Sequence, residues 1–165
     1  MATCLSKQTL KFLKQQLHIL HSDLDFFKKE AENICVKIAN DEENIHCLTE
    51  KKNAIEIDIS NVQQHLQPLL EKQRLEQNKV EKSTGKKRKR NEDEDTLCNV
   101  QVNLHNLECK HHALLIEIKM LMRLHLAKIT QKQYIFAKLQ TAKDEVCKCK
   151  AEINKCEEAN MNSFT

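Results

Sequence analysis

The sequence predicts an all-α protein: an extended coiled coil of two long helical segments separated by a charged linker, folded either as a helical hairpin or as an oligomeric bundle. The chain has one Gly, one Pro, no Trp and only 4% aromatic residues, whereas 31% of its residues are charged. A compact globular core of this length usually contains more aromatic and turn-forming residues. The third observation is a heptad repeat, which runs through both halves of the chain.

The first predicted element is an N-terminal coiled coil over residues 6–82. From Leu10 to Leu69 one heptad register continues without a slip, and all but two of its a and d positions are apolar. Such a repeat keeps its seam against a partner only if the helices supercoil, so it predicts association as well as helix. The predicted oligomer seam consists of Leu10, Leu13, Leu17, Leu20, Leu24, Phe27, Ile34, Ile38, Ile45, Leu48, Ile55, Ile59 and Val62.

Pro68 is the only residue that interrupts this element. A proline inside a helix removes a backbone hydrogen bond and costs about 3 kcal/mol. We therefore expect helices over 6–66 and 68–82, with a kink between them near Pro68.

The second predicted element is a charged linker over residues 83–95. It contains the only glycine, Gly85, followed by a run of cations and then a run of acids. The cations fit a nuclear import signal, and the alternative is a solvated linker. Direct nucleic-acid binding is disfavoured, because the acids of 92–95 adjoin the cluster and the net charge is only +3. The candidate signal is Lys86, Lys87, Arg88, Lys89 and Arg90.

The third predicted element is a C-terminal coiled coil over 96–158, followed by a disordered tail over 159–165. Its register is offset by three residues from the first, so the linker either bends the chain or turns it back. Its e positions include Leu115, Met122, Ile129 and Phe136, which widen the apolar face beyond a two-stranded seam. This partner face either binds a further helix or covers the first half of the same chain.

Two charges inside the first seam, Asp41 at d and Lys52 at a, limit how the helices can pair. A parallel homodimer would place like charges opposite each other, which is costly in a seam. A hairpin folded about residues 86 and 87 would instead set Asp41 against Lys132, and an antiparallel homodimer would set Asp41 against Lys52. Flanking pairs such as Lys51 with Glu56 fit a parallel dimer, but exposed pairs contribute only about 0.2 to 1 kcal/mol each. A different coiled-coil partner with matching charges would also satisfy the pattern.

The sequence offers little chemistry. Without glycine-rich loops we expect no enzyme activity and no cofactor. His105, Cys109 and His112 share one helical face but lack a fourth ligand, so we interpret them as exposed polar residues and expect no metal site. The eight cysteines occur in a chain with no expected secretory leader, which favours free thiols. His111 and His125 lie on the seam. We expect them to form polar layers there, and the alternative is a contact that depends on pH.

These features together predict a non-enzymatic coiled-coil scaffold that self-associates and binds a helical partner in a nuclear assembly, such as one associated with chromosomes. The alternative is a cytoskeletal, centrosomal or ciliary adaptor in which the basic cluster is only a linker. We expect the partners to be the chain itself or another coiled-coil protein, with an import receptor if the cluster is a signal. No membrane association is expected, because nowhere do eighteen apolar residues run together.

Overall fold

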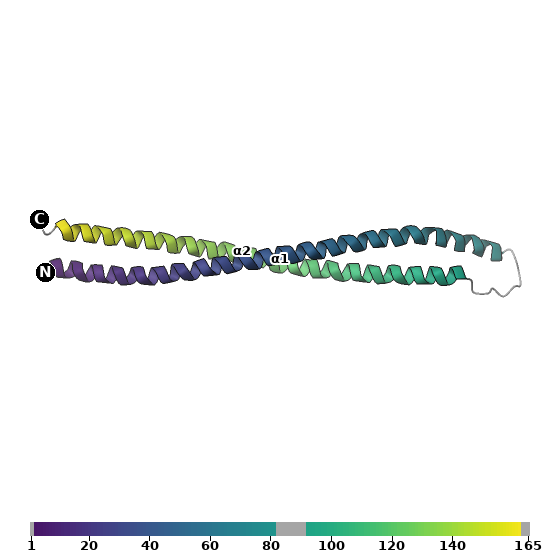
Figure 1. Cartoon of the computed structure of the whole chain (residues 1–165), viewed down its shortest axis with the longest axis horizontal. Helices are drawn as coiled ribbons and strands as arrows, with labels where there is room; N and C mark the ends of the chain where they lie inside the picture. The colour runs from purple at the N-terminus through teal and green to yellow at the C-terminus, as the bar shows by residue number, and fades with distance from the viewer. Residues whose placement is uncertain (1, 82–91, 163–165) are drawn as a thin grey trace. The chain divides into compact units, whose positions relative to one another are not determined.

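The chain folds into two long helices in the computed structural model, which describes residues 2–81 and 92–162, with side chains over 7–79 and 94–162. Helix α1 spans Ala2–Glu81 and helix α2 spans Glu92–Asn162 (Figure 1). All described residues belong to these two helices. The predicted all-α fold is therefore confirmed, and the two helices pack against each other as a helical hairpin.

The hairpin divides into two compact units, each built from one segment of α1 and one of α2. Unit 1 contains Met1–Asp41 and Leu124–Thr165, and unit 2 contains Glu42–Arg123. In unit 1, Lys14 contacts Glu157 and Asp41 contacts Lys128, so the paired segments run antiparallel. In unit 2, Glu56 contacts His111, while Leu69 and Leu97 line one small cavity, which shows the same antiparallel pairing.

Unit 1 has a continuous apolar core at the predicted seam. Alanines at two of its positions alternate with larger aliphatic side chains, an arrangement that allows the helices to approach closely and interdigitate. Each large aliphatic side chain that is fully buried stabilises the fold by roughly 1.5 to 3 kcal/mol. The core consists of Leu24, Ala31, Ile34 and Ile38 from α1 with Ile135, Leu139, Ala142 and Val146 from α2.

Unit 2 has a more open seam. Among the described residues of this unit, the buried apolar side chains are Leu97 and Ile118, and both belong to α2. The α1 positions of this seam are half-buried, and polar Lys52 and His111 occupy two of its layers. Because polar layers weaken a seam while they fix its register, we assign less of the hairpin's stability to unit 2 than to unit 1.

The structure corrects the prediction that the first helix breaks at Pro68. Helix α1 continues through this residue as a single helix, and begins earlier than predicted, at Ala2. The half-buried Leu66 and Leu69 on either side of Pro68 explain the continuity, since their burial offsets the lost backbone hydrogen bond. A bend at this point stays a prediction.

The structure also corrects the predicted bounds of the linker and the tail. Helix α2 begins at Glu92, so the acidic run of 92–95 is its first turn and not part of a linker over 83–95. Of the described side chains, Glu94 and Asp95 lie in this turn, where the positive end of the helix dipole stabilises acidic residues. Helix α2 continues to Asn162, because its last turns pack near Leu10, with which Asn160 and Met161 line a shared groove. Residues 163–165 of the predicted tail lie outside the described residues.

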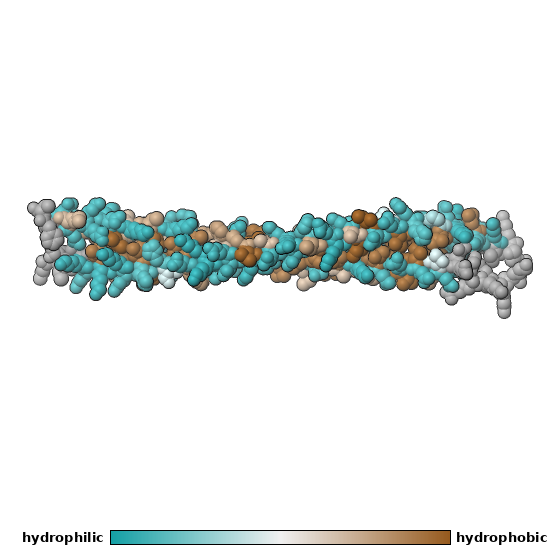
Figure 2. Space-filling view, viewed as in Figure 1, coloured by the Kyte–Doolittle hydropathy of each residue, from teal (hydrophilic) through white to brown (hydrophobic). Residues whose placement is uncertain are grey.

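The surface of the described residues is mostly polar. Figure 2 shows hydrophobic residues running between hydrophilic ones on the face in view. Neither α1 nor α2, over the ranges described, contains a stretch long and apolar enough to cross a membrane.

Candidate functional site

The predicted oligomer seam packs against α2 of the same chain in unit 1. Leu24, Ile34 and Ile38 are buried in the core, and Leu17, Leu20 and Phe27 pack against it. The remaining predicted seam residues are half-buried, and these are Leu10, Leu13, Ile45, Leu48, Ile55, Ile59 and Val62. The predicted a and d positions are therefore buried or half-buried, and in unit 1 they form the interior of a hairpin, whereas their part in an oligomer stays a prediction.

A partly buried ion pair lies at the end of the unit 1 core. Asp41 is only 9% exposed, and its Oδ2 accepts a hydrogen bond from Nζ of Lys128 at 2.6 Å. The predicted partner in a hairpin, Lys132, was wrong by one helical turn. Lys128 at d and Lys132 at a are successive seam positions of α2, and in an antiparallel pair both lie next to a d residue of α1 such as Asp41. Lys128 makes the contact. The Lys132 ammonium instead lies 5.5 Å from the centre of the Phe136 ring.

Lys52, the second charge in the seam, belongs to a polar cluster in unit 2. Its Nζ lies 3.4 Å from Oε1 of Glu56, one turn along α1, and the same oxygen lies 3.0 Å from Nε2 of His111 on α2. The hydrogen bond with His111 is the main cause of a lowered pKa for Glu56; burial opposes this shift, and Lys52 adds to it. The predicted pairing of Glu56 with Lys51 on a parallel twin is replaced by this cluster, which gives His111 a partner across the seam.

The predicted partner face is divided by the structure. Leu115 and Ile129 are half-buried, and Ile129 packs against the core of unit 1. Met122 and Phe136 are exposed. Half of the partner face therefore covers the same chain, which was one of the two alternatives predicted for it. The other half is exposed.

Exposed apolar residues are frequent on α2 between 116 and 136. Tyr134 and Phe136 are partly shielded by lysines, with Nζ of Lys138 5.6 Å from the centre of the Tyr134 ring. Four members of this set, Ile116, Met120, Leu126 and Tyr134, lie at outward heptad positions that a search for seams overlooks. The signal that could have found them is a helix segment that is apolar all round. These exposed apolar residues belong to each unit separately, and we use the name outer α2 face for the whole set along the helix: Ile116, Met120 and Met122 in unit 2, and Leu124, Leu126, Tyr134 and Phe136 in unit 1.

The predicted polar histidines and cysteines show no metal geometry. Sγ of Cys109 lies 3.7 Å from Nε2 of His105, and these residues and His112 are exposed. No group of three or more metal-binding side chains occurs within the described parts of the chain. Seven cysteines in these parts carry free thiols, and buried Cys149 donates to the carbonyl oxygen of Leu13 at 3.4 Å.

The candidate import signal, residues 86–90, lies outside the described residues. Comparisons of the chain with protein-family models, with curated proteins and with solved structures each give no match. The proposed function therefore depends on the surfaces and charges described above.

Removal of only one partner of the Asp41–Lys128 pair should destabilise the fold. We expect Asp41→Leu to lower the free energy of unfolding by about 1 to 3 kcal/mol, because it leaves Lys128 without its carboxylate in a half-buried position. Adding Lys128→Leu should recover most of the loss, since two leucines extend the apolar core. Urea denaturation followed by circular dichroism measures both variants. Equal losses in the single and double variants would show that the pair does not couple the helices.

The Glu56 cluster predicts a pH-dependent stability. Because the pKa of Glu56 is lowered below its ordinary value of 4.5, its ionised form stabilises the fold above that pH, and the contribution disappears as the pH falls through the lowered folded pKa. We expect Glu56→Gln to reduce the Tm at about pH 7, and we expect this deficit to shrink progressively as the pH falls below 4.5. Thermal melts of both proteins across this range test the prediction. A deficit that persists unchanged at low pH would mean that the carboxylate charge is not its cause.

Proposed function

We propose that this chain is a non-enzymatic helical scaffold that self-associates and binds a helical partner in a nuclear assembly, such as one associated with chromosomes. The observation that carries the proposal is the outer α2 face. Seven large apolar side chains on one stretch of α2 are between 43% and 65% exposed, although α1 already fills the seam. Concentrated apolar exposure of this kind is typical of interaction surfaces.

The spacing of these residues favours a helix as the partner. Ile116, Met120 and Leu124 follow one another at intervals of four, and Met122 and Leu126 begin a second row with the same interval. Rows of this kind are the ridges that fit into the grooves of a neighbouring helix. Two methionines suit such a surface, because their flexible side chains adapt to the shape of a partner.

The nuclear part of the proposal depends on residues 86–90, because import receptors recognise short basic clusters of this kind. The alternative function, a cytoskeletal, centrosomal or ciliary adaptor, would use the same outer α2 face in another compartment. Composition supports the non-enzymatic part, because a chain with one glycine cannot form the usual phosphate-binding loops.

Substitution of the outer α2 face tests the proposal. We expect Met120→Glu with Leu126→Glu to abolish recovery of partners in affinity purification of the tagged chain, because two charges would be buried on docking. The matched control is Ile57→Glu with Leu75→Glu, which changes two equally exposed apolar residues of α1. Circular dichroism should show unchanged helix content in both variants. Identical partner sets for the wild type and the Met120→Glu, Leu126→Glu variant would contradict the proposal.

The compartment is tested in the same purification, performed separately on nuclear and cytoskeletal fractions. We expect the wild type and its partners in the nuclear fraction, and a variant with residues 86–90 changed to alanine in the cytoplasm. Recovery from the cytoskeletal fraction, unaffected by the alanine changes, would favour the adaptor.

A further inference from the structure

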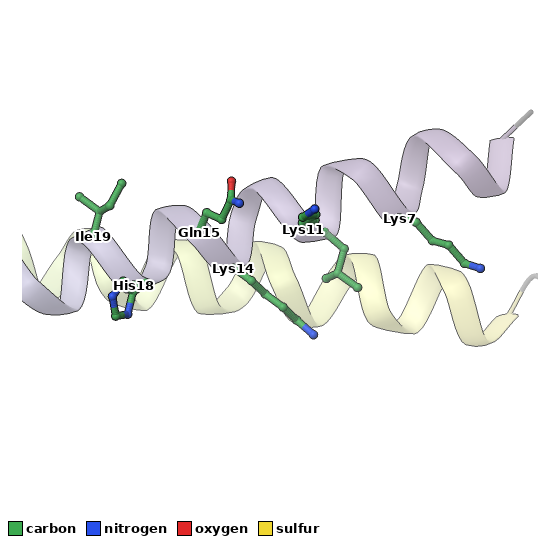
Figure 3. Close-up of a pocket in the computed structure, with 7 residues that line it drawn as sticks. Lys7, Lys11, Lys14, Gln15, His18 and Ile19 are labelled. Atoms are coloured by element: carbon green, nitrogen blue, oxygen red, sulfur yellow. The ribbon is translucent and has the colours of Figure 1, made fainter.

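Unit 1 carries a groove on α1 that is lined mainly by basic side chains. Lys7, Lys11, Lys14 and His18 surround it, with Leu10 and Ile19 as its apolar residues. Figure 3 shows Lys7, Lys14 and His18 extending on the side of α1 where α2 runs, with Ile19 directed away from them. We call this surface the basic groove.

Further lysines lie on the same side of the seam. In an antiparallel pair the e positions of both helices flank one side, and the g positions flank the other. The e positions of unit 1 include exposed Lys28 on α1 and exposed Lys143 and Lys150 on α2. The acid among them is Glu157, whose Oε1 lies 3.7 Å from Nζ of Lys14. This side of unit 1 therefore has a clear excess of positive charge.

A second groove of unit 1 has the opposite charge. Its acids are Glu145 and Glu152 from α2, with Lys148 as the single cation, and its apolar wall is formed by Phe12, Leu13 and Leu20 of α1. The g positions of α1 add Asp23 and Glu30 to this side. Two cations, Lys37 and Lys138, also lie at g positions on this side, farther along the two helices from the groove. We call this surface the acidic groove.

The two grooves lie on nearly opposite sides of α1. At about 100° per residue, the residues of the basic groove centre roughly 180° around the helix from Phe12, Leu13 and Leu20. Exposed apolar residues lie beside both grooves, and Phe12, Ile19 and Phe26 recur at intervals of seven, with 55% to 58% of each side chain exposed. Each groove thus combines a predominant charge, positive in the basic groove and negative in the acidic groove, with apolar area that a partner could cover.

We infer that a second copy of this chain docks here, with the basic groove of one copy against the acidic groove of the next. The net charge of only +3 supports this occupant, because the chain carries both signs in nearly equal amounts and separates them between two surfaces. Complementary potentials of this kind give orientation and register to an interface. The inference rests on the self-association in the proposed function and names the surface that performs it.

This geometry determines the form of the assembly. One contact uses the basic groove of one copy and the acidic groove of another, so each copy keeps one groove open. Such a contact is heterologous, and it continues into a ring or an open array instead of stopping at a dimer. The average mass should therefore rise past that of a dimer as concentration increases, and it should fall when salt screens the charges.

Charge reversal in each groove tests the inference by sedimentation equilibrium of the full chain. The first variant is Lys7→Glu with Lys11→Glu, and the second is Glu145→Lys with Glu152→Lys. Glu and Lys have similar helix propensities, so both variants should keep their helix content. The matched control is Lys29→Glu with Lys155→Glu, which changes the same charge at exposed positions that line neither groove.

We expect the wild type and the control to associate, and each reversed variant alone to sediment as the 19.3 kDa monomer. An equimolar mixture of the two reversed variants should associate again, because the acidified groove of one fits the basified groove of the other. If both variants associate as the wild type does, the grooves are not the interface, although self-association stands. If the wild type itself is monomeric at all concentrations, the proposed self-association and this inference both fail, and the basic groove is left to an acidic helix of another protein.

Discussion

The carboxylate of Asp41 is the constraint on which the pairing of the helices depends. A charge at a seam position can be buried only beside an opposite charge, and Lys128 of α2 supplies it at 2.6 Å. A parallel twin would place a second Asp41 there, so the ion pair favours the antiparallel hairpin. The same contact sets the register of unit 1, in which the apolar layers from Leu24 to Ile38 meet those from Ile135 to Val146.

Because the a and d seam of the hairpin is filled by its own two helices, the interactions proposed above use surfaces outside that seam. The outer α2 face is apolar, whereas the two grooves of unit 1 are charged and of opposite sign. These surfaces suit different tasks. An apolar helical face contributes affinity for a partner, while separated charges contribute orientation between copies. A scaffold requires both properties, and this division is the physical basis of the proposed function.

Much of the fold was predictable from the sequence, because periodicity is a local property. The heptads identified the α1 residues that are buried or half-buried in the hairpin, whereas their role in an oligomer stays a prediction; the charge of Asp41 favoured antiparallel pairing. The choice between Lys128 and Lys132 was not predictable, since both lie on the seam one turn apart and only the packed register separates them. The continuity through Pro68 also depended on burial of its neighbours, which propensity does not measure. Residues such as Leu126 and Tyr134 were missed because they lie at outward heptad positions, and only the apolar character of this segment all round the helix indicates them.

The most direct test of the hairpin is zero-length carbodiimide cross-linking of an equal mixture of unlabelled and nitrogen-15-labelled chains, read by mass spectrometry. We expect links between Asp41 and Lys128 and between Lys14 and Glu157, because both pairs are in contact. Each linked peptide should be entirely light or entirely heavy, since both helices come from one chain. Mixed light and heavy peptides at these positions would show that the seam joins different chains, and a link from Asp41 to Lys132 in place of Lys128 would contradict the register.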